Sequence, residues 1–425
     1  MLKLTFRFLA MATALFAAGF ASAQDSGPLI DLLIRKGVLN DQEAEELRAE
    51  LSRDAAAAVV STVSAGKSTN SIALSGRLQV QYAGVGSDQN LPDANQIFLR
   101  RVYFGMSAGL GAAWSVNFNY DFSGGNFDKA YAEWSGYFGA EPVAFDFGLR
   151  KVNFGYEEYT SSGSLKAIER SPVTRFFVEP NNGRRLGAAS YRMGLFLEGG
   201  EANVRKNRST GLFYGAALTT VNRTETFGDA SVDGAKSSSS GNGALNQMAV
   251  WTNVGYSRVV SPSTKFMVGA AYGFLPDVGG AGNSNFGRGH DISEFSLYGD
   301  LTVGRFNLAA EYLAAEVDGV LAAGTVAAKP SGYWVQPSFM VTEKLEAVVR
   351  YSEVDADGRG IRASDGIRSA PALRTGQRLE ESYFGLNYYF LGSDVKLQLG
   401  YLTGRTSEGA TEKVDGLRSQ LQLNF

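Results

Sequence analysis

The residues of this sequence that could do chemistry are mainly arginines in segments where polar and apolar residues alternate. Arg101 and Tyr103 are each followed by an apolar residue, so in a strand these two side chains would share the polar face. Arg77 and Arg150 lie on the polar face of their own segments by the same parity. Guanidinium groups gathered in a narrow polar tube attract anions and offer paired donors to phosphate or carboxylate oxygens. The pattern therefore predicts a site for small anionic solutes.

Arg100 precedes Arg101 directly and so has the opposite parity. An arginine on the lipid face of a membrane strand costs about 2–4 kcal/mol, so a bulge or a strand end is expected at this pair. A second role for the arginines is open. They could pair with Glu157, Glu158 or Glu169 and hold a loop in place, and this bracing role is compatible with anion binding.

The residue types and spacings that common catalytic sites need are missing from the sequence. The chain has no Cys and a single His, His290, which disfavours disulfides, His-based metal sites and a Ser-His-Asp triad. Glu157 and Glu158 are adjacent, and adjacent strand residues point to opposite faces, so they do not make a carboxylate pair. The formal net charge of −3 gives no sign of nucleic-acid binding. We expect a protein with no enzymatic activity, no cofactor and no metal.

The elements that would position these side chains are strands, because polarity alternates with a period of two from Ile72 to Phe425. At the end of the chain, Leu421, Leu423 and Phe425 alternate with polar residues. An apolar outer face and a polar inner face predict an all-β fold, a closed antiparallel transmembrane β-barrel. About sixteen segments of roughly ten residues would enclose an aqueous channel. Strand starts are predicted near residues 72, 98, 113, 127, 143, 185, 209, 247, 263, 292, 305, 331, 345, 380, 393 and 415.

The lengths of the connections alternate, as expected for long extracellular loops and short periplasmic turns. One connection, 123–126, is short where the alternation calls for a long one. Long connections are predicted at 83–97, 153–184, 222–246, 275–291, 315–330 and 355–379.

The N-terminal residues have a different pattern. Residues 1–23 combine a basic start, an apolar stretch and a small-residue cleavage site, which predicts a cleaved signal peptide. Residues 24–70 are predicted to be a periplasmic helical segment and linker, and residues 71–425 the barrel domain in outer-membrane lipid. The helices at 28–58 could form a coiled coil that helps three barrels associate, or a hairpin docked on their own chain.

Four stretches of the barrel part carry a more specific pattern. They are Gly76–Tyr82, Phe98–Tyr103 with Trp114 and Asn119–Asp121, Phe127–Ala130, and Thr160–Ser162 with Ala167–Ser171. In these stretches the sequence resembles the phosphate-selective porin O and P family, most specifically in the double arginine and in the pair Glu169-Arg170. The resemblance covers the N-terminal third of the barrel, while the C-terminal half matches mainly in pattern.

The resemblance implies a homotrimer of sixteen-stranded barrels. It also implies that the loop at 153–184 folds inward and forms the constriction of the pore. The residues that match constriction residues of phosphate-selective members by position are Arg100, Arg101, Tyr103 and Asp128.

The sequence departs from those members at several basic positions. A loop lysine of theirs falls on Gly163 here, although Lys166 lies nearby. Trp251–Asn253 and Ala314-Ala315 stand where further arginine-bearing strands would be expected. The resemblance therefore supports pore formation more strongly than it supports a preference for phosphate.

These observations predict a porin of the bacterial outer membrane, a water-filled channel for passive diffusion of small anions such as phosphate or pyrophosphate. Arg101 is expected at the constriction close to Arg170, whereas Arg258 is placed near a periplasmic turn. Two alternatives remain open. One is a general, weakly selective pore, and the other is a structural protein whose residues 28–58 tether the outer membrane to the cell wall.

Overall fold

The structure is a computed structural model that describes residues 69–179, 184–187, 190–200, 202, 210–221, 248–276, 291–318 and 327–425. The predicted signal peptide, the predicted helices at 28–58 and His290 lie outside these residues. The chain divides into two compact units, residues 1–74 with 106–112, and residues 75–105 with 113–425. The first unit contributes the beginning of one strand and the end of the next, and the second holds all other described elements.

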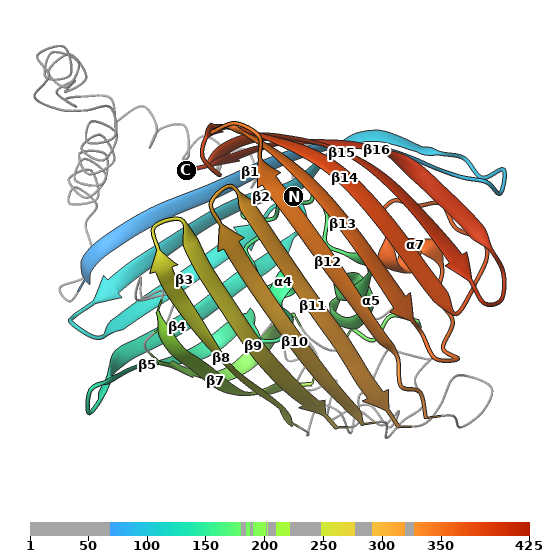
Figure 1. Cartoon of the computed structure of the whole chain (residues 1–425). Coiled ribbons are helices and arrows are strands. Elements are labelled where there is room, and N and C mark those ends of the chain that lie inside the picture. Colours follow the sequence, from blue (N-terminus) through green and yellow to red (C-terminus); the bar gives the residue numbers. More distant parts are fainter. Residues whose placement is uncertain are drawn as a thin grey trace, which may run out of the picture. The chain divides into compact units, whose positions relative to one another are not determined.

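The described strands form one closed antiparallel barrel (Figure 1), in which each strand pairs with its neighbours in sequence and β1 pairs with β16. The predicted fold and strand number are therefore confirmed. The strands are β1 (Thr69–Ser87), β2 (Ala94–Leu110), β3 (Trp114–Asp121), β4 (Asn126–Phe138), β5 (Glu141–Lys151), β6 (Tyr191–Gly199), β7 (Gly211–Thr220), β8 (Met248–Ser261), β9 (Thr264–Leu275), β10 (Ile292–Val303), β11 (Phe306–Val317), β12 (Ser331–Met340), β13 (Leu345–Asp355), β14 (Arg378–Leu391), β15 (Val395–Ser407) and β16 (Glu412–Asn424).

The two faces of the sheet follow the predicted alternation. In β16, Leu417 and Leu421 are 60% and 41% exposed, while the side chains of Gln420 and Gln422 are buried on the inner face. Apolar residues outside and polar residues inside are what lipid on one face and water on the other require. The backbones of Gly76 and Phe425 exchange hydrogen bonds of 2.8 and 3.1 Å beside this strand.

The predicted start of the sixth strand, near Arg185, is wrong. β6 begins at Tyr191, and Arg185 lies in the preceding loop. The backbone N–H of Leu186 donates to the carbonyl of Phe176 at 2.8 Å, so this stretch packs on the loop itself. Residues 152–190, from here the β5–β6 loop, are longer than predicted at their C-terminal end.

Two connections are shorter than alternation predicts. The connection between β1 and β2 was predicted to be long, at 83–97. It spans only residues 88–93, because β1 runs to Ser87. Ala83 and Val85 are fully buried on the inner face. Because these inner residues are apolar, the polar and apolar alternation stops before β1 ends, and the sequence therefore predicted too short a strand. Between β3 and β4 the structure confirms a tight turn, closed by a 2.8 Å hydrogen bond from Gly125 N–H to the Asp121 carbonyl.

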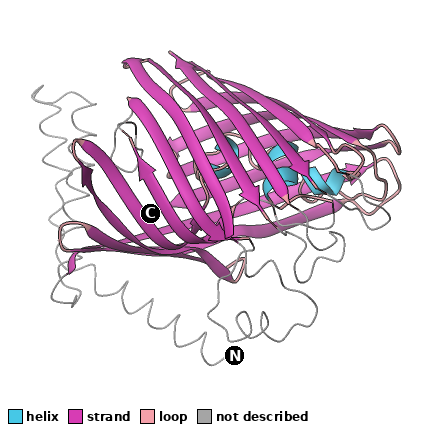
Figure 2. Cartoon of the chain, turned by 90° about the horizontal axis from the view of Figure 1, so that it is seen from below, coloured by secondary structure: helices cyan, strands magenta, loops and turns pink. Residues whose placement is uncertain are grey.

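The β5–β6 loop lies inside the barrel, as the family resemblance implied (Figure 2). It carries α4 (Tyr156–Tyr159) and α5 (Pro172–Val178). Ser171 caps α5 by accepting from the Thr174 N–H at 3.2 Å, and Pro172 occupies the first helical turn, where its missing N–H is harmless. None of the helices in the described ranges is long and apolar enough to cross a membrane.

α5 packs against β11, β12, β13 and β14 and against α7 (Ala363–Gly366), a helix of the β13–β14 loop at residues 356–377. Phe176 and Phe177 of α5 are fully buried in an apolar core with Trp334 and Leu379 of the wall. This core fills the lumen beside β11–β14. A cavity lies along β1–β6.

Candidate functional site

Both residues of the double arginine face the lumen, because the parity of β2 changes between them. Leu99 is 56% exposed and Phe104 is 42% exposed, so the outward positions change from odd to even. Arg100 reaches Glu169 and Arg101 is only 6% exposed. The irregularity expected from the cost of a lipid-facing arginine is present.

A second irregularity lies between β3 and β4. Asn119 pairs with Lys129, but Tyr120 pairs with Phe127, so Asp128 is the extra residue of a bulge. Asp128 and Lys129 consequently both line the lumen although they are adjacent. Lys129 has the inward parity of the regular part of β4, and the bulge turns Asp128 to the same face, where strict alternation would send it outside.

These irregular strands line a cavity of about 330 Å³ between the β1–β6 wall and the β5–β6 loop. Four cationic side chains and four tyrosines face it, and Asp128 is the one carboxylate among the described residues of its lining. The lining residues are Ser75, Gly76, Arg77, Tyr103, Asn119, Asp128, Lys129, Tyr131, Arg150, Lys151, Tyr159, Ser161, Ser162 and Tyr191.

Arg77 keeps its full charge in this cavity. Its guanidinium donates to Asn424 Oδ1 at 2.8 Å, to Ser162 Oγ at 2.7 Å and to Ser161 Oγ at 3.2 Å. All three partners are neutral, and within the described part of the chain no carboxylate forms an ion pair with it. The guanidinium also lies 5.8 Å from the centroid of the Tyr103 ring. Arg77 is therefore held in place but not neutralised.

The neighbouring cations are more strongly compensated. Arg150 forms ion pairs with Asp146 and Glu198, and Lys151 pairs with Glu158 at 2.8 Å. Asp128 itself accepts hydrogen bonds from Tyr191 and, at 3.2 Å, from Asn119.

Four predicted site residues lie outside the lining of the cavity and form braces instead. Arg100 pairs with Glu169 at 2.6 Å, Lys166 with Glu346 at 2.7 Å and Arg170 with Glu158 at 2.8 Å. Arg101 donates to Gln79 Oε1 at 2.8 Å. The pairing of arginines with loop glutamates, expected from sequence as the bracing role, is present.

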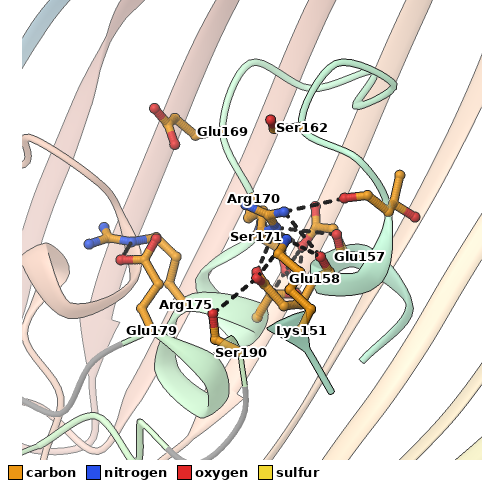
Figure 3. Close-up of polar contacts among 12 residues, drawn as sticks. Lys151, Glu157, Glu158, Ser162, Glu169, Arg170, Ser171, Arg175, Glu179 and Ser190 are labelled. Carbon is orange, nitrogen blue, oxygen red and sulfur yellow. Dashed lines mark hydrogen bonds and ion pairs between the residues drawn. The ribbon is translucent and has the colours of Figure 1, made fainter. Parts of the chain in front are cut away.

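The two adjacent glutamates of the loop do not lie on a strand, as the sequence argument assumed, but on α4. Both are buried and they face different partners (Figure 3). Glu157 accepts from Ser171 Oγ at 2.7 Å and Thr174 Oγ1 at 2.6 Å, and it pairs with Arg350 at 3.0 Å. Glu158 lies between Lys151 and Arg170. The pair therefore fixes the loop to both sides of the barrel.

Two further loop carboxylates are stabilised in their charged forms. Burial would raise the pKa of Glu169, but the cations of Arg100 and Arg368 outweigh it and hold that pKa well below its usual range. Burial opposes ionisation of Glu179 as well, yet Arg175 and Arg368 lower its pKa to about 2. Both braces are therefore ionic at neutral pH.

Sequence reasoning found Arg77, Tyr103, Asp128 and Arg150 among the lining residues and missed the others. Tyr131 has the inward parity of its strand and could have been found in that way. Lys129 has the same parity as Tyr131 and could have been found in the same way, whereas the direction of Asp128 depends on the bulge.

Comparison with known proteins bears on the family and the fold of the chain. The family described as "Phosphate-selective porin O and P" matches residues 72–425. Among solved structures, the outer membrane channel DcaP of Acinetobacter baumannii has a TM-score of 0.53 at 11% identity, covering 85% of this chain and 99% of its own. An anion-selective porin from Comamonas acidovorans has a TM-score of 0.52 at 13% identity, covering 83% of this chain and 99% of its own.

OmpT of Vibrio cholerae, an outer membrane protein, has a TM-score of 0.50 at 12% identity, covering 85% of this chain and 99% of its own. At these identities the likeness shows the fold alone. No curated protein matches the chain. The family match spans the whole barrel, and the chain belongs to the phosphate-selective porin O and P family of outer-membrane channels.

Proposed function

We propose that this porin conducts small anions along the β1–β6 wall and that Arg77 is its principal anion-binding group. One observation carries the proposal. The cavity on this side of the lumen is lined by four cationic side chains against one carboxylate, and Arg77 has only neutral partners.

The physical basis is the low effective dielectric of a narrow, partly dewatered tube. Two unit charges about 4 Å apart interact by about 4 kcal/mol at an effective dielectric of 20, against about 1 kcal/mol in water. Acidic residues of the outer loops are screened within roughly 8–10 Å at ordinary ionic strength. The net charge of −3 for the whole chain is therefore a poor guide to the preference of the pore.

Arg101, which the sequence placed at the constriction, has a different part in this proposal. Its side chain is buried behind Gln79, so it would raise the local potential without touching the solute. Arg77 lies on the surface of the cavity and would make the contact. Arg100, Lys166 and Arg170 would hold the loop that narrows the passage.

The geometry at Gly163 supports phosphate as a solute. A Cβ added there would lie 2.5 Å from Nη2 of Arg77, so the guanidinium occupies the space next to the residue where related porins carry a lysine. A guanidinium offers two parallel donors to phosphate oxygens, where an ammonium is a point charge.

Reversal potential in a salt gradient across a planar bilayer tests the proposal. Arg77→Gln should shift the reversal potential toward cation preference and weaken block by phosphate at least about tenfold, which corresponds to about 1.4 kcal/mol. Arg258→Gln is the control, because this exposed residue of β8 lies near the turn at 262–263. Unchanged ion preference in Arg77→Gln would favour the alternative, a general pore with weak selectivity.

A homotrimer is part of the proposal. One structural neighbour, at 11% identity, is described as a trimer form of OmpT. A secreted precursor, cleaved after residue 23, is the proposed route to the outer membrane. The helices that could join three barrels or tether the cell wall lie outside the described residues, and sedimentation of the purified protein tests the trimer.

A further inference from the structure

Arg418 of β16 is a buried arginine whose hydrogen bonds are incomplete. Its side chain is 3% exposed, and its Nη2 donates to the backbone carbonyl of Arg368. Nε and Nη1 have no hydrogen-bond partner within the described ranges of the chain. Buried polar groups in proteins nearly always have a partner, which can be a protein group, a water molecule or an ion.

The carboxylates closest to Arg418 are engaged by other arginines. Glu169 is paired with Arg100 at 2.6 Å and with Arg368 at 3.2 Å. Glu381 is paired with Arg350 at 2.8 Å. No carboxylate among the described residues forms an ion pair with Arg418, so its buried charge has no direct counter-ion, an unfavourable arrangement in a dry interior.

Arg418 borders a small chamber of about 10 Å³ between β14, β16 and the two inward loops. This volume is about that needed for the centre of one water-sized particle. The polar groups that surround it are mostly cationic, with four guanidinium groups against two carboxylates. The charged lining residues are Glu169, Arg170, Arg350, Arg368, Glu381 and Arg418.

We propose that this chamber binds a single monatomic anion, a halide such as chloride, with Nε and Nη1 of Arg418 as its donors. One negative charge here would balance Arg418, the one arginine in the described lining of the chamber that forms no ion pair with a carboxylate. The size of the chamber excludes phosphate and sulfate, whose four oxygens need more room. The ion would be a fixed part of the protein, because no residue of this chamber lines the larger cavity.

Diffraction from crystals of the full chain grown in sodium bromide tests the site. Data collected at the bromine absorption edge should show an anomalous peak in the chamber, within hydrogen-bond distance of Arg418. Arg418→Met should lose this peak. Absence of an anomalous peak from the wild-type chamber, including the case where ordinary water density fills it, would overturn the proposal. This result needs no variant, so it decides even where Arg418→Met does not assemble.

Thermal unfolding supplies a second test in solution. The wild-type midpoint should rise with chloride concentration when sodium gluconate replaces sodium chloride to keep ionic strength constant. Arg418→Met should lose this dependence, whereas Arg77→Gln, which alters the larger cavity, should keep it. A wild-type midpoint that is equal in chloride and gluconate would contradict the halide site.

Discussion

At the scale of single residues, Gly163 determines where Arg77 can lie. A Cβ at this position would approach Nη2 and Cζ of Arg77 to 2.5 and 2.7 Å, too close for any side chain unless the guanidinium moved. The hydrogen bonds from Arg77 to Ser161 and Ser162 therefore depend on the missing side chain at 163.

Gly163→Ala should displace Arg77 from both serines and reduce anion preference. The expected reversal potential lies between those of the wild type and Arg77→Gln, because the charge remains but its position is lost. Gly299→Ala is a matched control, since a Cβ there meets its nearest atom at an ordinary 3.5 Å. Wild-type selectivity in Gly163→Ala would show that the position of Arg77 is unimportant.

Asp128 has the opposite effect on the same cavity. It is the one carboxylate among the described lining residues, so Asp128→Asn should increase anion preference by removing a charge worth about 1–4 kcal/mol at contact distance. The amide can still accept from Tyr191, which keeps the local structure. Bilayer reversal potentials measure the change, with Asp394→Asn in the β14–β15 turn as the control. A shift toward cations would argue against the site.

At the scale of elements, the β5–β6 loop is held to the β13–β14 loop by ion pairs. Arg368 pairs with Glu169 at 3.2 Å and also with Glu179, and Arg184 pairs with Asp365 at 2.6 Å. Hydrogen bonds to charged groups contribute about 1.5–3 kcal/mol each, so this contact can fix the loop against the wall.

The pH dependence of this contact follows from Glu179. Its pKa is about 2 in the folded protein, below the usual value of about 4.3. The ion pair of Glu179 with Arg368 therefore contributes its full stabilisation above about pH 4, and this stabilisation is lost as the pH falls toward 2. Single-channel conductance should be steady from pH 8 to pH 5 and become unstable in the acid range below pH 4. Instability that begins between pH 5 and 7 would implicate another group.

Arg368→Gln should mimic acid at neutral pH. Removing this cation leaves Glu179 with fewer partners and should destabilise the loop by about 1–3 kcal/mol, visible as new closures in single-channel records. Arg378→Gln is a control, because Arg378, the first residue of β14, pairs with Glu353 at 3.2 Å and with Asp355, which both lie on β13 and not on the β5–β6 loop. Equal frequencies of closure in the two variants would mean that the contact of Arg368 with the β5–β6 loop does not stabilise the open channel.

At the scale of the whole molecule, Phe425 extends the pairing of β1 with β16 that closes the barrel. Phe425 and Gly76 exchange backbone hydrogen bonds of 2.8 and 3.1 Å. The Phe425 ring packs directly over Gly76, because a Cβ added to this glycine would lie 2.2 Å from the ring. Deleting Phe425 should lower the fraction of heat-resistant barrel seen on semi-native gels. Leu423→Ala, which keeps these bonds, should have a smaller effect, and normal assembly of the deletion would contradict this role.

The outward face of the barrel could be predicted from the sequence better than the inward face. Lipid imposes one rule on every outward residue, so strand number, order and parity could be read from alternation alone. The lumen imposes no such rule. Ala83 and Val85 face it although they are apolar, and that hid the end of β1.

The contacts of the inward loop were beyond sequence reasoning for a further reason. Arg350 and Glu157 pair across 193 positions of sequence, and no local pattern links them. Arg77 was found because it lies in a regular stretch paired with β16, whereas the inward direction of Asp128 depends on a bulge and was expected only from the family resemblance.

The apolar core beneath α5 has a consequence before the barrel exists. Leu313, Ala315 and Val317 of β11 face this core, while Tyr312 of the same strand faces lipid, so this end of β11 is largely apolar on both sides. Such stretches tend to aggregate when exposed to water. An unfolded chain in transit through the periplasm exposes them, whereas strands that border the open lumen show water a polar face. We expect the chaperones that escort this chain to cover this end of β11.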